Sequence, residues 1–280
     1  MDQESKNRFT RLIESQDSDF DLAEAALLVA KEEYPDLNVD DYLRKLDRMA
    51  DMVRQRLKDD PTPNDIALAI NETLFNFTGM TGNWREYYDP RNSYLNDVLD
   101  RKLGIPITLS VVYIELARRL GLSVEGLGFP GHFLVKYAID DGEVVLDPFR
   151  GGRSLSLEEL NRRLEETLGE DFPGLEYAPH LLDATPKKEI LIRLLNNLKG
   201  IYRANSQWEK ALSVQNLILQ VSVDDPADIY DRARLLERLE CFDSAKADYQ
   251  EFIQRSSDEA KVQMARRRLV DLIQHSPVLN

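Results

Sequence analysis

Residues 106–120 place the strongest constraint on how this chain can fold. Apolar side chains occupy nearly every face of the segment, at Ile107, Leu109, Val111, Val112, Ile114, Leu116, Ala117 and Leu120. A helix that is apolar all round belongs inside a core. Pro106 suits the first turn of such a helix, and Gly121 suits its C-terminal cap. We therefore expect a buried central helix, with the other elements of the domain packed around it.

Downstream of this helix the hydrophobic period changes to that of strands. Residues 123–129, 132–139 and 143–147 have the pattern of strands, and Asp141-Gly142 is a tight-turn signal between the last two. Ser156 followed by Glu159 forms a capping box for a helix over residues 157–168. The sequence thus predicts strands that follow the buried helix, and then a further helix.

The N-terminal residues 1–79 carry helical signals. Three helix starts precede apolar runs, at Asp21 with Glu24, at Asn38 and at Thr62-Pro63. Residues 83–105 are mixed and contain a short helix that ends at Gly104. A stretch with several prolines and glycines, residues 169–186, precedes an all-helical tail. We predict an N-terminal helical part (1–82), a mixed core (83–172), a connector (173–186) and helical repeats (187–280).

The helical tail repeats itself every 34 residues. Trp208 and Phe242 are separated by this interval, and so are Ala211 and Ala245. A tetratricopeptide-like order of residues is visible at Leu198, Gly200, Tyr202, Trp208, Ala211 and Pro226. The small alanine lets paired helices approach, and the aromatic side chain fills the gap between them. Since such repeats are common docking platforms, Tyr202 and Trp208 are candidate binding residues for a protein or peptide partner.

The composition excludes several classes of function. The net charge of −14 argues against nucleic acid and against anionic membrane surfaces. The N-terminus has no apolar signal-peptide core, and no run approaches the roughly 20 apolar residues of a membrane helix. His180 and His275 lack partners at ligand spacing, so neither a metal nor another cofactor is expected. We expect a cytoplasmic protein.

His132 and Asp147 are the residues that point to chemistry. A His and an Asp on successive strands form the orienting half of a Cys-His-Asp hydrolase or acyltransferase site, in which the Asp fixes the His tautomer. The nucleophile of such a site is a thiol at a helix N-terminus. The only cysteine is Cys241, far downstream in the helical tail, where we expect a buried small apolar residue. The sequence keeps the His-Asp half without its thiol.

The run from Asn92 to Gly152 resembles the SirB-type family, a bacterial group with a transglutaminase-like core and a tetratricopeptide-like tail. The matching segments are Asn71-Glu72-Thr73-Leu74-Phe75, Asn92-Ser93-Tyr94-Leu95, Gly104-Ile105-Pro106-Ile107-Thr108-Leu109-Ser110, Arg118-Arg119-Leu120-Gly121, Phe129-Pro130-Gly131-His132-Phe133-Leu134 and Asp147-Pro148-Phe149. The resemblance implies a papain-like α+β core with an N-terminal helical subdomain and a C-terminal all-α extension. It also implies that His132 and Asp147 match the His and Asp of the superfamily, and that Pro106 occupies the cysteine slot.

Three interpretations of this pattern remain open. In the first, the chain is a non-catalytic protein- or peptide-binding module, and the degenerate cleft around His132 and Asp147 binds an extended peptide or a side chain. In the second, it is a hydrolase or acyltransferase in which Thr108 or Ser110 replaces the thiol; hydroxyls at a helix start more often cap the preceding turn. In the third, it is a regulatory scaffold in which the His-Asp pair is inherited packing.

Asn92, Tyr94 and Pro106 are candidate binding residues beside the start of the central helix. For Asn92 and Tyr94, a turn that simply packs the loop is an equal alternative.

Overall fold

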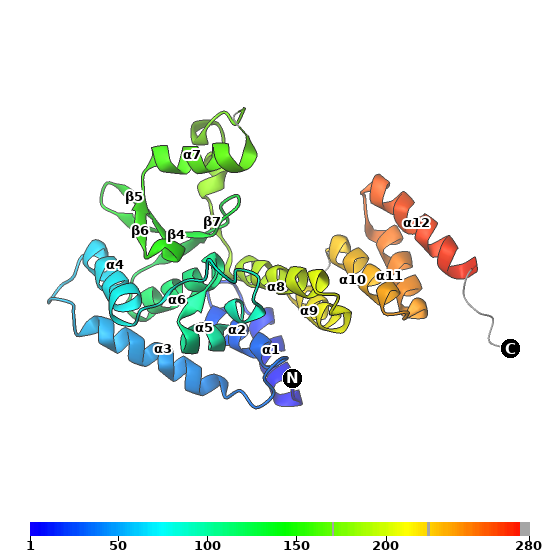
Figure 1. Ribbon diagram of the computed structural model, residues 1–280, viewed down its shortest axis with the longest axis horizontal. Coiled ribbons are helices and arrows are strands. Elements are labelled where there is room, and N and C mark those ends of the chain that lie inside the picture. The colour runs from blue at the N-terminus through cyan, green and yellow to red at the C-terminus, as the bar shows by residue number, and fades with distance from the viewer. Residues whose placement is uncertain (170, 223–224, 275–280) are drawn as a thin grey trace. The chain divides into compact units, whose positions relative to one another are not determined.

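The computed structural model describes residues 1–169, 171–222 and 225–274, and it divides after Leu194 into two compact units (Figure 1). The first unit contains N-terminal helices and an antiparallel sheet, and the second is built of helices. Each unit is described by itself below.

The region expected to be helical, residues 1–79, contains four α-helices, and the last three begin at the caps that the sequence predicts. They are α1 (Gln3–Glu14), α2 (Leu22–Ala30), α3 (Val39–Arg54) and α4 (Pro63–Asn71), and a π-helical turn, Glu72–Phe77, continues α4. The side chains of Asp21, Asn38 and Thr62 each accept a hydrogen bond from a main-chain N–H in the first turn of the helix that follows. These bonds satisfy donors that a helix start leaves without partners, which explains why the predicted caps define the boundaries.

The apolar segment forms the buried central helix, α6 (Pro106–Arg119), as predicted. Short helix α5 (Leu95–Arg101) precedes it. Every side chain from Pro106 to Ala117 is buried, including Glu115, whose carboxylate is paired with Arg118 at 2.8 Å and with Arg119 at 2.6 Å. These two ion pairs allow one acidic side chain to lie within the core.

The principal sheet has five strands and is antiparallel throughout. In spatial order the strands are β6 (Arg153–Leu155), β5 (Gly142–Asp147), β4 (Leu134–Ile139), β3 (Val124–Leu127) and β7 (Ala184–Thr185). The expected strand over 132–139 begins two residues late. Because Gly131 adopts a positive φ of 70° in a turn, His132 lies in the bend before β4, and its expected position on a strand is wrong. A separate parallel pair joins β1 (Thr81–Gly82) to β2 (Leu103–Gly104).

Helices cover both faces of the sheet. Helix α7 (Leu157–Leu168) begins at the predicted cap Ser156 and packs Leu160 and Leu164 on one face, against Leu134 and other sheet residues. Helix α6 contacts β3 and β4 from the other side (Figure 1). The strands therefore form the middle layer of the first unit.

The stretch expected as a connector contributes to this unit. It contains two short 3-10 turns, Leu175–Tyr177 and Pro179–Leu182, and then β7, which pairs with β3. The start of α8 (Lys187–Ala204) is held by the N-terminal region: the Asp17 carboxylate accepts hydrogen bonds from the main-chain N–H groups of Lys187 and Lys188, both at 3.1 Å. The division between the two units falls within α8.

The second unit continues with helices that follow the predicted repeat. They are α9 (Trp208–Val221), α10 (Pro226–Arg238), α11 (Phe242–Arg255) and α12 (Glu259–Gln274). Trp208 and Phe242 are the first residues of α9 and α11, and Ala211 and Ala245 are fully buried. In the part of the chain that the structure describes, no helix is both long enough and apolar enough to cross a membrane.

Candidate functional site

A cavity of about 780 Å³ opens in the first unit where the start of α6, the turn before β4 and the end of β5 come together. Its lining combines aromatic side chains, arginines and the predicted histidine. The lining residues are Trp84, Tyr87, Tyr88, Pro106, Phe129, Pro130, Gly131, His132, Phe149, Arg150, Arg162, Arg163, Glu166 and Thr167.

His132 and Asp147 meet beside this cavity. The Nε2 atom of His132 lies 3.0 Å from Oδ1 of Asp147, whose side chain is fully buried. The same Oδ1 accepts hydrogen bonds from the main-chain N–H groups of Phe149 and Arg150, at 3.1 and 3.3 Å. With Nε2 engaged by the carboxylate, Nδ1 is the ring nitrogen left for a ligand.

Arg163, on α7, is a second partner of the buried carboxylate. Its Nη1 donates to Oδ2 of Asp147 at 2.9 Å, so the Asp lies between an imidazole and a guanidinium. Burial raises the pKa of Asp147, but its hydrogen bonds with His132 and Arg163 and their positive charge outweigh this effect and hold the pKa below its ordinary value. The carboxylate therefore stays ionised at neutral pH and can orient the imidazole.

Arg193 fixes the turn that carries His132. Its guanidinium donates to the main-chain oxygens of Phe129, at 3.2 Å, and of His132, and it lies over the ring of Phe133. Burial lowers the pKa of Arg193 from its ordinary value. These contacts hold the backbone on both sides of the Pro130-Gly131 turn, so the histidine is positioned through its main chain as well as its side chain.

Aromatic rings form one wall of the cavity. The ring of Phe149 lies 4.1 Å from that of Trp84 and 5.8 Å from the imidazole of His132, measured between centroids. Arg150 places its guanidinium over the exposed face of Trp84 at 5.5 Å. Trp84 is 58% exposed and Tyr88 76% exposed, so large apolar surfaces are presented to solvent at the cavity. Such surfaces are typical of sites that bind another molecule.

Asn92 supports the loop that carries this aromatic wall. Its Nδ2 donates to the main-chain oxygens of Glu86 and Tyr87, at 2.6 and 3.3 Å, and its Oδ1 accepts from Asn83 at 3.1 Å. Asn92 is fully buried and Tyr94 is 3% exposed, with its ring edge-on to that of Tyr34. Neither residue lines the cavity, so this geometry is that of packing residues beneath it.

The hydroxyls of Thr108 and Ser110 are fully buried and face the main chain. Thr108 Oγ1 donates to the Asn92 carbonyl at 2.7 Å, and Ser110 Oγ lies 3.5 Å from the carbonyl oxygen of Phe133. Among the described contacts, no hydrogen bond joins either hydroxyl to His132. Pro106, in contrast, lines the cavity at the first position of α6.

Cys241 lies in the second unit and is exposed, so the expectation that it is a buried apolar residue is wrong. It occupies the N-cap position of α11, with its backbone outside helical geometry and its Sγ 3.6 Å from the carbonyl oxygen of Leu239. His180 is exposed, and His275 lies outside the described residues. Within the described residues, no three His, Cys, Asp or Glu side chains are grouped as a metal site would require.

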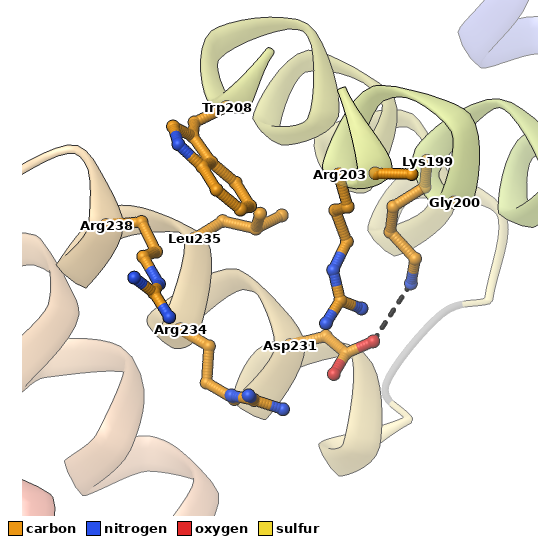
Figure 2. A pocket seen from close by; sticks show the side chains of 9 residues that line it. Lys199, Gly200, Arg203, Trp208, Asp231, Arg234, Leu235 and Arg238 are labelled. Atoms are coloured by element: carbon orange, nitrogen blue, oxygen red, sulfur yellow. Dashed lines mark hydrogen bonds and ion pairs between the residues drawn. The ribbon is translucent and has the colours of Figure 1, made fainter. Parts of the chain in front are cut away.

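The two candidate residues of the second unit differ in placement. Tyr202 is buried, with Lys210 Nζ 5.5 Å from its ring centroid. Trp208 lines a second cavity, of about 390 Å³, between α8 and α10 (Figure 2).

Sequence reasoning missed Arg163, Arg193 and Trp84. A signal for Arg163 was present, because it stands between Leu160 and Leu164 on the apolar face of its helix, where an unpaired charge would be costly. Arg193 and Trp84 had no comparable signal, because their neighbours at the site are distant in sequence.

Comparisons with known proteins agree with this architecture. A family model described as the transglutaminase-like superfamily matches residues 40–196, and a tetratricopeptide-repeat model matches residues 198–270. A UPF0162 protein of Xylella fastidiosa strain 9a5c is 39% identical over 256 residues, which cover 91% of each chain. A UPF0162 protein of Vibrio cholerae is 27% identical over 269 residues, covering 94% of this chain and 97% of the relative.

Among solved structures, a crystal structure of menin aligns with 99% of this chain and 77% of its own at 12% identity and a TM-score of 0.38, a similarity too low to support an argument. The two family models, and the alignments that cover more than 90% of this chain, agree on its family. The chain belongs to the UPF0162, or SirB-type, family, with a transglutaminase-like core followed by a C-terminal tetratricopeptide region.

Proposed function

We propose that this chain is a non-catalytic protein- or peptide-binding module whose cavity around His132 and Asp147 receives an extended peptide or a projecting side chain. The observation that carries the proposal is Pro106. It lines the cavity at the first position of α6, where the resemblance places the nucleophile, and a proline side chain has no nucleophilic atom.

The hydroxyls near the start of α6 support the same conclusion. A general base must lie within hydrogen-bond reach, about 3 Å, of the group that it activates. The hydrogen bonds of Thr108 and Ser110 go to main-chain oxygens, and both side chains are fully buried. This geometry weighs against the alternative of a hydrolase or acyltransferase that uses one of these hydroxyls with His132 and Asp147.

The chemistry of the lining suits binding. Trp84 and Phe149 offer apolar ring faces, Arg150 offers a guanidinium group beside Arg162, which is paired with Glu166 of the same lining, and His132 offers a ring nitrogen. Aromatic and arginine side chains supply most of the energy in protein interfaces. A partner with an apolar side chain next to main-chain or acidic oxygens would satisfy both kinds of group.

A peptide library displayed on phage, selected on the whole chain, tests the proposal. Selected peptides are then titrated against the unaltered chain and the Trp84→Ala variant by fluorescence anisotropy. We expect a loss of affinity of at least about tenfold, because buried tryptophans dominate interfaces. Tyr177→Ala is the matched control, since Tyr177 is 70% exposed and does not line the cavity.

Two results would contradict the proposal. The first is a set of selected peptides whose affinity is the same for the unaltered chain and for Trp84→Ala. The second is turnover of an ester or a glutamine-containing peptide that His132→Ala abolishes, because that would show catalysis.

A further inference from the structure

The cavity of the second unit carries an excess of positive charge in a chain that is strongly acidic. Four cationic residues line it, namely Lys199 and Arg203 from α8 and Arg234 and Arg238 from α10, against the single carboxylate of Asp231. Acidic residues outnumber basic ones by 50 to 36 in the whole sequence. The concentration of cations at this place therefore runs against the composition of the chain.

One of these cations is neutralised within the unit. Lys199, which is 6% exposed, donates from Nζ to Gln215 Oε1 at 2.7 Å and to Asp231 Oδ2 at 2.9 Å. The charges of Lys199 and Asp231 cancel, and their ion pair joins the facing surfaces of α8 and α10. The net positive charge of the cavity therefore comes from the three guanidinium groups.

Arg203, Arg234 and Arg238 are available to a ligand. Their side chains make no ion pair or hydrogen bond with the residues that the structure describes. Arg232, which shares α10 with Arg234 and Arg238, instead donates two hydrogen bonds to Asp248, at 2.7 and 2.8 Å. Arg238 lies over the ring of Trp208 at 5.5 Å. Figure 2 shows Trp208 and Leu235 between Arg238 and Arg203, so an apolar patch lies between positive groups.

A neighbouring cavity in the second unit, of about 840 Å³, extends the same surface from α10 to α12. It shares Arg234 and Arg238 with the cavity of Figure 2 and adds Tyr230, Met264, Arg267 and Arg268, together with the carboxylates of Glu237, Glu240 and Asp271. A surface that runs over successive helices of a repeat is long enough for several residues of extended chain. An isolated phosphate would use only one part of it.

We propose that the surface lined by Arg203, Trp208, Arg234, Leu235 and Arg238 binds an extended acidic peptide, with carboxylates on the arginines and an apolar side chain on Trp208 and Leu235. Arginine suits this task because its planar guanidinium engages a carboxylate through two parallel hydrogen bonds. The assignment is independent of the cavity around His132.

The test uses the whole chain and a fluorescein-labelled peptide, Glu-Asp-Leu-Glu-Glu-Leu, followed by anisotropy. The neutral probe has the same sequence with glutamine and asparagine in place of each acid. We expect the acidic peptide to bind at least about tenfold more tightly than the neutral probe, with an affinity that falls as salt rises.

Variants locate the binding. Arg234→Gln with Arg238→Gln should weaken the acidic peptide by at least about tenfold, and Arg203→Gln on the other helix should weaken it as well. The matched control is Arg266→Gln, because Arg266 is an exposed arginine of α12 that lines neither cavity. It should change the affinity less than about twofold.

Three outcomes would overturn the proposal. The acidic and neutral probes could bind equally well, or the Arg234→Gln, Arg238→Gln double variant could bind the acidic peptide with full affinity. In the third outcome, inorganic phosphate displaces the labelled peptide as effectively as the unlabelled peptide does. An affinity that depends on Trp84 instead of these arginines would assign the peptide to the first unit, which would overturn this inference and support the proposed cleft.

Discussion

Replacing the buried Asp147 by asparagine tests how the cavity around His132 is held together. Oδ1 of Asp147 accepts from His132 and from the main chain of Phe149 and Arg150, and Oδ2 accepts from Arg163 at 2.9 Å. Asparagine can keep the first set of bonds, but its amide then presents N–H donors to a guanidinium that is itself a donor. The variant leaves Arg163, whose side chain is 11% exposed, without its hydrogen-bonded counterion.

The expected cost follows from this burial. Removing one partner of a buried ion pair costs about 3–5 kcal/mol. Arg163 keeps Glu159 at 3.7 Å, and asparagine preserves the shape of the side chain, so we expect the lower end, about 3 kcal/mol. If the free energy of unfolding falls by about 2–3 kcal/mol for each molar of urea, the urea concentration at the unfolding midpoint should fall by roughly 1–1.5 M.

Tryptophan emission can isolate the first unit in this assay. Trp84 lies in the first unit and Trp208 in the second, so a Trp208→Phe background leaves Trp84 to report unfolding around the cavity. Asp248→Asn is the matched control, since Asp248 is a buried carboxylate bound to Arg232 in the second unit. It should leave the Trp84 transition unchanged.

The difference between the unaltered chain and Asp147→Asn should also depend on pH. Because the folded-state pKa of Asp147 is lowered, its charge contributes stability that is fully present above the ordinary pKa, about 3.9, and is lost as pH falls through the folded value. The difference should therefore shrink progressively below about pH 4. Two results would refute this reasoning. One is a loss of unfolding free energy in Asp147→Asn of less than about 1 kcal/mol at pH 7, and the other is a difference between the two chains that stays constant from pH 7 to pH 3.

Three further substitutions probe other parts of the first unit. Pro106→Cys in a Cys241→Ala chain should give a thiol whose pKa lies up to about 1.5 units below the ordinary 8.5, because the residue stands at the start of α6. The pH dependence of its alkylation by iodoacetamide measures this pKa, and a midpoint at or above about pH 8.5 would contradict the prediction. Gly152→Ala should lower the free energy of unfolding, measured in urea, by about 1–3 kcal/mol more than Gly151→Ala does. Both residues have positive φ, but only at position 152 would the new Cβ collide with a side chain of α4, so equal losses for the two variants would exclude the collision. Asn92→Ala should cost about 1–3 kcal/mol and make Trp84 easier to quench with acrylamide, and unchanged quenching would mean that Asn92 does not support the loop.

Local signals in the sequence were sufficient for the main elements of the fold. The apolar run of α6, the caps at Asp21 and Ser156 and the 34-residue interval each depend on neighbouring residues or on a fixed period, and all appear in the structure. The short strands β6 and β7 did not appear in the prediction, because two or three residues are too few to show alternation. The strand prediction left Pro130-Gly131 outside both strands, but it resumed at His132, whereas the turn extends further and β4 begins at Leu134.

The candidate site was less accessible to such reasoning. The sequence order of His132 and Asp147 suggested a pair, and their hydrogen bond is present, although their role stays a prediction. Arg163 joins them from a helix that crosses the sheet, and the cationic surface of the second unit combines α8 with α10. Which faces of these helices meet depends on packing angles that a single sequence does not state.

The bonds between Asp17 and the start of α8 have a consequence for synthesis of the chain. Their partners are 170 and 171 residues apart, and β7, which completes the sheet edge, is also among the last parts of the first unit to be made. At about 5–20 residues per second, a ribosome needs roughly 8 to 34 s to pass from one partner to the other. During that interval the segment between α1 and α2, which carries Asp17, lacks its hydrogen-bond partners on α8. The first unit should therefore fold late in translation, as one cooperative step, and a chain released before residue 187 should be a substrate for proteases.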